Sequence, residues 1–134
     1  MSTDNTKKVV RELVDAHVRH DVPRVKEILS PRLIWHGGGA AQTMGRDDYV
    51  TGLEMGAKAF SDQKIELGPL VAEGDEVAAV MTITMRHTGE FQGIAPTGRT
   101  ITFASMWFYR IVEARVVEAW QLDEDLLAKL RAET

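Results

Sequence analysis

The sequence contains no cysteine, which excludes disulfide bridges and thiolate chemistry. It has no apolar run near the ~20 residues that a membrane-spanning helix needs, so we expect no membrane segment. It also lacks an excess of positive charge, because its formal net charge is -4 at pH 7. Nucleic-acid binding usually needs a basic surface and is therefore not expected. The first residues are polar and lack the apolar core of a secretory signal peptide, so we expect a cytoplasmic protein.

The composition that remains is typical of a globular protein. Of the 134 residues, 44% are hydrophobic and 27% are charged. A chain of this length can bury a core but is short for two domains. We therefore expect a single domain over residues 1–134, and we find no internal repeat or linker.

The first part of the chain has the periodicity of amphipathic helices. Apolar residues recur at helical spacing from about Thr3 to His20, with charged residues between them. Asp21 suits the N-cap of a short second helix, with Pro23 in its first turn. A third helix is predicted to open at Gly45. His17 and His20 lie on or just after the first helix, and we interpret both as structural or solvent-exposed.

The rest of the chain has the period of two that indicates strands. Strands are predicted over residues 32–36, 63–73, 76–86, 99–111 and 115–122, followed by a short helix over 125–131. The glycine-rich residues 37–41 form a predicted loop without a phosphate-binding motif. Helices followed by antiparallel strands indicate an α+β protein in which helices cover one face of a curved sheet.

One irregular connection joins two of the predicted strands, between His87 and Arg99. It contains three glycines and Pro96, which suit bends and tight turns. His87 therefore stands at the end of an apolar strand face, beside an irregular rim. Dry walls with a few polar groups are what a small-molecule pocket needs.

Three segments resemble SnoaL-like polyketide cyclases of the NTF2-like superfamily. They are Val71 to Val77 (VAEGDEV), Arg86 to Phe91 (RHTGEF) and Gly93 to Thr100 (GIAPTGRT). The resemblance implies an NTF2-like cone, with three N-terminal helices packed on a curved, mostly antiparallel sheet. It also implies a homodimer through the outer face of the sheet, to which Thr82, Thr84, Thr100 and Thr102 are suited.

The resemblance further implies an enzyme without metal or cofactor that acts on a hydrophobic carbonyl compound. In the family, an aspartate four residues after a tryptophan of the last strand is the general acid/base. That position is Glu124 here, and Asp123 comes one residue earlier. Ala95, Ala114 and Ala119 are further departures from the family pattern, at positions where proline, glycine and histidine are common.

A carboxylate in an apolar pocket has a clear chemical use. It can remove a proton next to a carbonyl group, while hydrogen-bond donors opposite stabilise the enolate. That step begins an aldol-type cyclisation and equally a double-bond isomerisation. Two other readings stay open: a small-molecule-binding module without catalysis, and a related hydrolase on the same fold.

The catalytic candidates are Asp123, Glu124 and His87. Strand parity favours Glu124, which shares a face with Trp120 and Leu122, although a bulge would reverse the two faces. The alternatives are that residues 123–125 are a solvated acidic cap of the last helix and that His87 only holds the loop. A metal site from His36 and His87 is not expected, because a third ligand is missing.

The candidates for binding substrate are aromatic rings, a polarizable methionine, a histidine and an arginine. Most aromatic and methionine side chains of a protein belong to its core. Arg110 suits a substrate carboxylate or enolate, or instead an ion pair with Glu118. The full set is Trp35, His36, Met85, Phe91, Trp107, Arg110 and Trp120.

Overall fold

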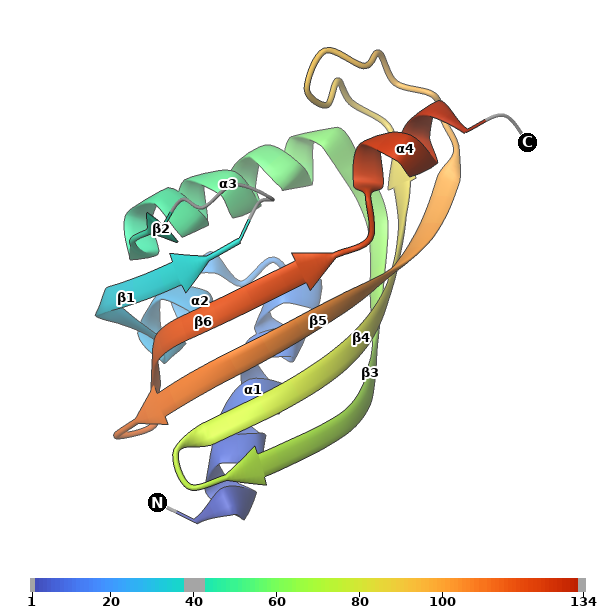
Figure 1. Ribbon diagram of the computed structural model, residues 1–134. Coiled ribbons are helices and arrows are strands. Elements are labelled where there is room, and N and C mark those ends of the chain that lie inside the picture. Colours follow the sequence, from blue (N-terminus) through green and yellow to red (C-terminus); the bar gives the residue numbers. More distant parts are fainter. Residues whose placement is uncertain (1, 38–42, 133–134) are drawn as a thin grey trace.

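The computed structural model describes residues 2–37 and 43–132 (Figure 1). Its strands form one sheet in the order β2-β1-β6-β5-β4-β3, which is antiparallel except where β1 pairs with β6. The sheet is strongly curved, and α1, α2 and α3 lie on its inner side (Figure 1). The α+β architecture predicted from the sequence, with helices first and a curved, mostly antiparallel sheet, is confirmed.

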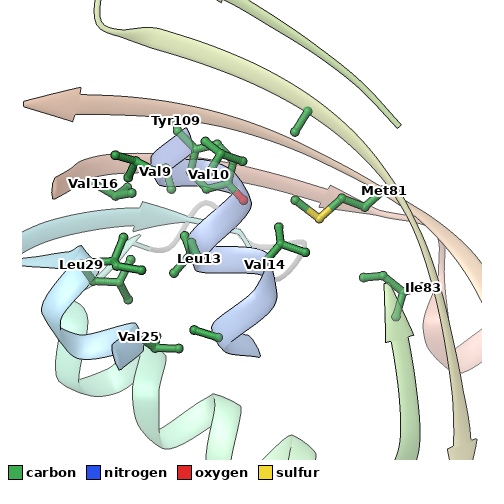
Figure 2. Close-up of a cluster of buried hydrophobic side chains, with 14 of the residues drawn as sticks. Val9, Val10, Leu13, Val14, Val25, Leu29, Met81, Ile83, Tyr109 and Val116 are labelled. Atoms are coloured by element: carbon green, nitrogen blue, oxygen red, sulfur yellow. The ribbon is translucent and has the colours of Figure 1, made fainter. Parts of the chain in front are cut away.

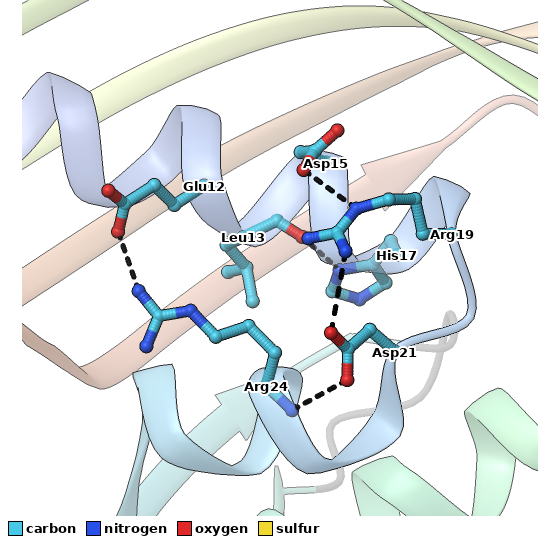
Figure 3. Close-up of polar contacts among 7 residues, drawn as sticks. All are labelled: Glu12, Leu13, Asp15, His17, Arg19, Asp21 and Arg24. Atoms are coloured by element: carbon cyan, nitrogen blue, oxygen red, sulfur yellow. Dashed lines mark hydrogen bonds and ion pairs between the residues drawn. The ribbon is translucent and has the colours of Figure 1, made fainter.

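The helices begin and end close to their predicted bounds. They are α1 (Thr3–Val18), α2 (Val22–Ile28), α3 (Arg46–Ala59) and α4 (Leu126–Arg131). The side chain of Asp21 accepts a hydrogen bond from the backbone N–H of Arg24, as expected of an N-cap (Figure 3). Among the described residues, no helix is both long and apolar enough to cross a membrane.

The strands are β1 (Leu29–His36), β2 (Thr43–Met44), β3 (Phe60–Glu73), β4 (Glu76–His87), β5 (Thr100–Val112) and β6 (Arg115–Asp123). The sequence did not predict β2, a two-residue edge strand that pairs with the end of β1. β1 begins three residues earlier than predicted, because Leu29 already pairs with Val116 of β6. Of the glycine-rich segment predicted as a loop, residues 37–41, all but Gly37 lie outside the described residues.

The core lies between α1 and the inner face of the sheet. Val9, Val10, Leu13 and Val14 of α1 are buried together with Met81, Ile83, Tyr109 and Val116 of the strands (Figure 2). Burying an apolar side chain of this size contributes about 1.5–3 kcal/mol. Alternate residues of β4 are buried from Val77 to His87, which is the period of two that the sequence shows. The side of the sheet that faces α1 is thereby fixed.

A bulge in β6 decides which of its side chains reach this inner face. Ile111 of β5 pairs with Val116, but the preceding Arg110 pairs with Glu118, so Val117 is an extra residue. Before the bulge, Val116 is fully buried. After it, the inward positions are Ala119, Gln121 and Asp123, which pair with Tyr109, Trp107 and Ser105. Trp120, Leu122 and Glu124 therefore belong to the outer face.

Candidate active site

A cavity of about 580 Å³ lies between α1, α3 and the inner face of the sheet. Its wall is mostly apolar, as a site for a hydrophobic small molecule requires. The apolar lining includes Val14, Trp35, Leu53, Phe60, Met81, Met85, Phe91, Phe103 and Trp107, and the polar lining includes His17, Tyr49, Gln63, Tyr109, Gln121 and Asp123.

Asp123, at the end of β6, presents its carboxylate to this cavity. One of its oxygens accepts a hydrogen bond from the hydroxyl of Ser105, and the other accepts one from the side-chain amide of Gln121 at 2.8 Å. Ser105 is fully buried, whereas Asp123 is solvent-exposed, which places the carboxylate at the mouth of the cavity. Donors on both oxygens fix the orientation of the carboxylate.

Two tryptophans hold the donors of Asp123 in place. The indole N–H of Trp107 donates to the Ser105 hydroxyl oxygen at 2.9 Å. The indole N–H of Trp35 donates to the Gln121 carbonyl oxygen at 3.1 Å. Because both indoles also line the cavity, its wall and its carboxylate form one connected structure.

A second polar pair lies in the wall contributed by the helices. The Nε2 of His17 lies 2.6 Å from the Tyr49 hydroxyl, and its Nδ1 lies 2.8 Å from the Leu13 carbonyl oxygen (Figure 3 shows the latter contact). Burial lowers the pKa of His17, and His20 adds to this effect. Burial raises the pKa of Tyr49, and the negative charge of Asp123 adds to that effect. At neutral pH both side chains are uncharged.

Tyr109 is the remaining tyrosine of the cavity. It is buried, and its ring stacks on Trp107 with centroids 5.4 Å apart. Burial raises its pKa well above the ordinary value, with a smaller contribution from Tyr49. Its hydroxyl therefore stays protonated and can donate a hydrogen bond.

Glu124 lies outside the cavity. Its carboxylate accepts a hydrogen bond from the backbone N–H of Ala104 at 2.6 Å and approaches Lys129 at 3.5 Å. The backbone hydrogen bond lowers its pKa, and Lys129 adds to this. The preference that strand parity gave to Glu124 is therefore wrong, because the bulge at Val117 turns that face outward.

His87 is fully buried and does not line the cavity. Its Nδ1 accepts a hydrogen bond from the backbone N–H of Thr97, and its own backbone bonds to Arg99 and Gly98. Its ring packs on Phe60, whose side chain does line the cavity. The residue holds the β4–β5 connection against the sheet, as the structural alternative proposes.

Three of the predicted substrate-binding residues lie on the outer face of the sheet. His36 stacks on Trp120 at 4.9 Å and bonds to Glu118 at 2.7 Å. Arg110 pairs with Glu118 at 3.0 Å and lies over the Trp120 ring. The prediction that His36, Arg110 and Trp120 line the pocket is wrong. The bulge in β6 turns Trp120 and its partner His36 outward, whereas Arg110 faces outward through the unbroken alternation of β5, in which Tyr109 and Ile111 are buried. Trp35, Met85, Phe91 and Trp107 do line the cavity.

Comparison with known proteins assigns the chain to a family. The family model of SnoaL-like polyketide cyclases matches residues 7–132. The chain belongs to this family. The relationship predicted from the sequence is thereby confirmed. A search of curated proteins found no match.

Solved structures of SnoaL-like proteins share the fold over nearly the whole chain. AclR, a proposed hydroxylase from Streptomyces galilaeus, is 32% identical with a TM-score of 0.87, covering 96% of this chain and 82% of its own. IdmH, a proposed polyketide cyclase from Streptomyces antibioticus, is 23% identical with a TM-score of 0.84, covering 95% and 99%. A proposed SnoaL-like cyclase from Jannaschia is 18% identical with a TM-score of 0.84, covering 98% and 95%. The NTF2-like cone is the shared architecture.

Four polar residues of this SnoaL-like site, Ser105, Gln121, His17 and Tyr49, have no sequence signal that marks them as functional. Ser105 and Gln121 carry no motif, but their alternation with Trp107 and Asp123 is visible once the bulge is known. His17 occupies an apolar helical position, which is also what a buried structural histidine does. Tyr49 lies in α3, and only the fold shows that this part of the helix faces a cavity.

Proposed function

We propose that this SnoaL-like protein removes a proton from the carbon next to a carbonyl group of a hydrophobic small molecule, with Asp123 as the base. The observation that carries the proposal is the Asp123 carboxylate, held by Ser105 and Gln121 at the mouth of a mostly apolar cavity. A carboxylate needs such fixed orientation to reach a C–H proton, and a bound hydrophobic ligand would displace water from around it.

The proton and the charge can be followed through the step. Asp123 takes the proton of the C–H bond, and the electron pair moves onto the carbonyl oxygen to give an enolate. Tyr109 lines the cavity and keeps its hydroxyl proton, so we assign it the hydrogen bond to that oxygen. The enolate then attacks a second carbonyl of the same molecule, which is aldol cyclisation, or is protonated at another carbon, which is isomerisation. In both cases Asp123 returns its proton, to the new alkoxide oxygen in cyclisation and to the other carbon in isomerisation.

A hydrogen-exchange assay tests the base without knowledge of the natural substrate. In D₂O, the CH₂ group next to the carbonyl of 1-tetralone exchanges its hydrogens for deuterium, and ¹H NMR follows the loss of signal. We expect the wild-type protein to accelerate this exchange and D123N to lose about 100-fold or more of the acceleration. E124Q is the matched control, one residue away and outside the cavity, and should stay within about twofold of wild type. Equal rates in wild type and D123N would exclude Asp123 as the base.

The identity with AclR favours hydroxylation of a hydrophobic small molecule as the second candidate function. Mass spectrometry of the products separates the two candidates. Hydroxylation adds one oxygen atom, whereas an intramolecular aldol addition leaves the mass unchanged and an aldol condensation loses water. Tight binding of 1-tetralone without any exchange would instead identify a binding module.

We also propose that two copies pair through the outer face of the sheet. Exposed apolar side chains gather there: Ile34, Val80, Met106, Phe108 and Leu122. Arg110 and Glu118 among them form an ion pair at 3.0 Å, and Glu118 also bonds to His36 at 2.7 Å, so pairing would not bury the Arg110 or Glu118 charge alone. Light scattering on wild type and M106E tests this: we expect a dimer that M106E converts to a monomer, and a monomeric wild type would refute it.

A further inference from the structure

The hydrogen bonds of His17 determine where its protons are. Its Nδ1 lies 2.8 Å from the carbonyl oxygen of Leu13, one turn earlier in α1 (Figure 3). A carbonyl oxygen can only accept a hydrogen bond, so Nδ1 carries a proton. Because burial keeps the ring neutral, Nε2 carries none. Nε2 is therefore an acceptor.

This tautomer fixes the orientation of the Tyr49 hydroxyl. The oxygen of Tyr49 lies 2.6 Å from Nε2 of His17, and the hydrogen between these atoms must come from the tyrosine. No other hydrogen bond of this hydroxyl occurs within residues 2–37 and 43–132. With its hydrogen committed to His17, Tyr49 has only lone pairs to offer a ligand.

The ring of Tyr49 is held rigidly at the cavity wall. Trp35 and Trp107 form T-shaped contacts with it at centroid distances of 5.4 and 6.2 Å, with interplanar angles of 72° and 82°. These are the same indoles that support Gln121 and Ser105 beside Asp123. Tyr49 and Asp123 are therefore held in one frame around the same cavity.

We propose that Tyr49, oriented by His17, forms a subsite that accepts a hydrogen bond from a hydroxyl group of the ligand. The ligand class is a hydrophobic carbonyl compound that also carries a phenolic or enolic hydroxyl, away from the carbon that loses its proton. The subsite selects such a hydroxyl over a methoxy group, because an ether oxygen has no hydrogen to donate. Its lone pairs would face those of the Tyr49 oxygen and repel them. The proposal rests on the cavity of the proposed function being the ligand site.

Paired probes test the subsite by binding alone. Calorimetry compares 2-naphthol with 2-methoxynaphthalene on wild type, Y49F and D123N. In wild type we expect 2-naphthol to bind about 3- to 10-fold more tightly, the equivalent of one neutral hydrogen bond. In Y49F this preference should fall to near one, while the affinity for 2-methoxynaphthalene stays within about twofold. D123N should keep the preference.

Several results would overturn the subsite. They are an unchanged preference in Y49F, loss of the preference in D123N instead, or no binding of 2-naphthol to wild type. A measurement on the wild type alone guards against misfolding of Y49F: ¹⁵N NMR of His17 at pH 7.5 should show a protonated Nδ1 and an unprotonated Nε2, and the reverse would refute the geometry. None of these outcomes depends on turnover, so failure here is distinct from failure of D123N in the exchange assay.

Discussion

Removing the hydroxyl of Ser105 should destabilise the protein through Trp107. In the wild type, the indole N–H of Trp107 donates to the Ser105 oxygen at 2.9 Å, and Ser105 is fully buried. In S105A this N–H faces a methyl group. An unpaired buried donor costs about 1–3 kcal/mol. The lost hydrogen bond to Asp123 adds little, because that carboxylate is exposed and water replaces the donor.

We therefore expect S105A to lower the free energy of unfolding by about 2 kcal/mol. Urea unfolding followed by tryptophan fluorescence measures this value, with an unchanged dependence on urea concentration showing that the denatured state is comparable. A double-mutant cycle isolates the cause. W107F removes the N–H, so it should cost about 1 kcal/mol less in the S105A background than in the wild type. Additive effects, or an S105A variant within about 0.5 kcal/mol of wild type, would refute the reasoning.

Three further outcomes follow from single features of the structure. Ala114 has φ of 63° in the β5–β6 turn, a strained conformation that glycine adopts without cost. Urea unfolding of A114G should therefore show a free energy of unfolding about 0.5 kcal/mol higher, because the relief of strain exceeds the extra entropy that glycine gives the unfolded chain. Burial lowers the pKa of His17, so protonation favours the unfolded state and the free energy of unfolding should fall as pH drops below 6.5. The decline should be weaker in H17Q, and the same pH profile of unfolding in H17Q and wild type would contradict this. Arg110 is on the outer face, so the rate of 1-tetralone exchange with R110A should stay within about twofold of wild type. A tenfold lower exchange rate would show that Arg110 contributes to the site.

The fold was largely predictable because its signals are local. The inward face of β4 repeats every second residue, and Asp21 followed by Pro23 marks a helix start whatever the remainder of the chain does. β2 was not predictable, since two residues carry no period and this strand exists only through its pairing with Trp35 and His36.

The site was less predictable because one extra residue in β6 exchanges the inward and outward sides of the residues that follow it. Val117 has no feature that marks a bulge, yet it exchanges the faces of everything after it in β6. That single shift moves Trp120 and Glu124 outward and brings Gln121 and Asp123 inward. His36 lies outward because it pairs with Trp120, whereas Arg110 lies outward because β5 alternates without a break between the buried Tyr109 and Ile111.

The central claim is that Asp123 faces a bound carbonyl compound inside the cavity. A crystal structure of the protein with 1-tetralone tests it most directly. We expect the ligand between Trp35, Trp107 and Asp123, with its CH₂ carbon next to the carbonyl about 3–3.5 Å from a carboxylate oxygen. A ligand bound elsewhere, or an Asp123 carboxylate turned into solvent beside an occupied cavity, would contradict it.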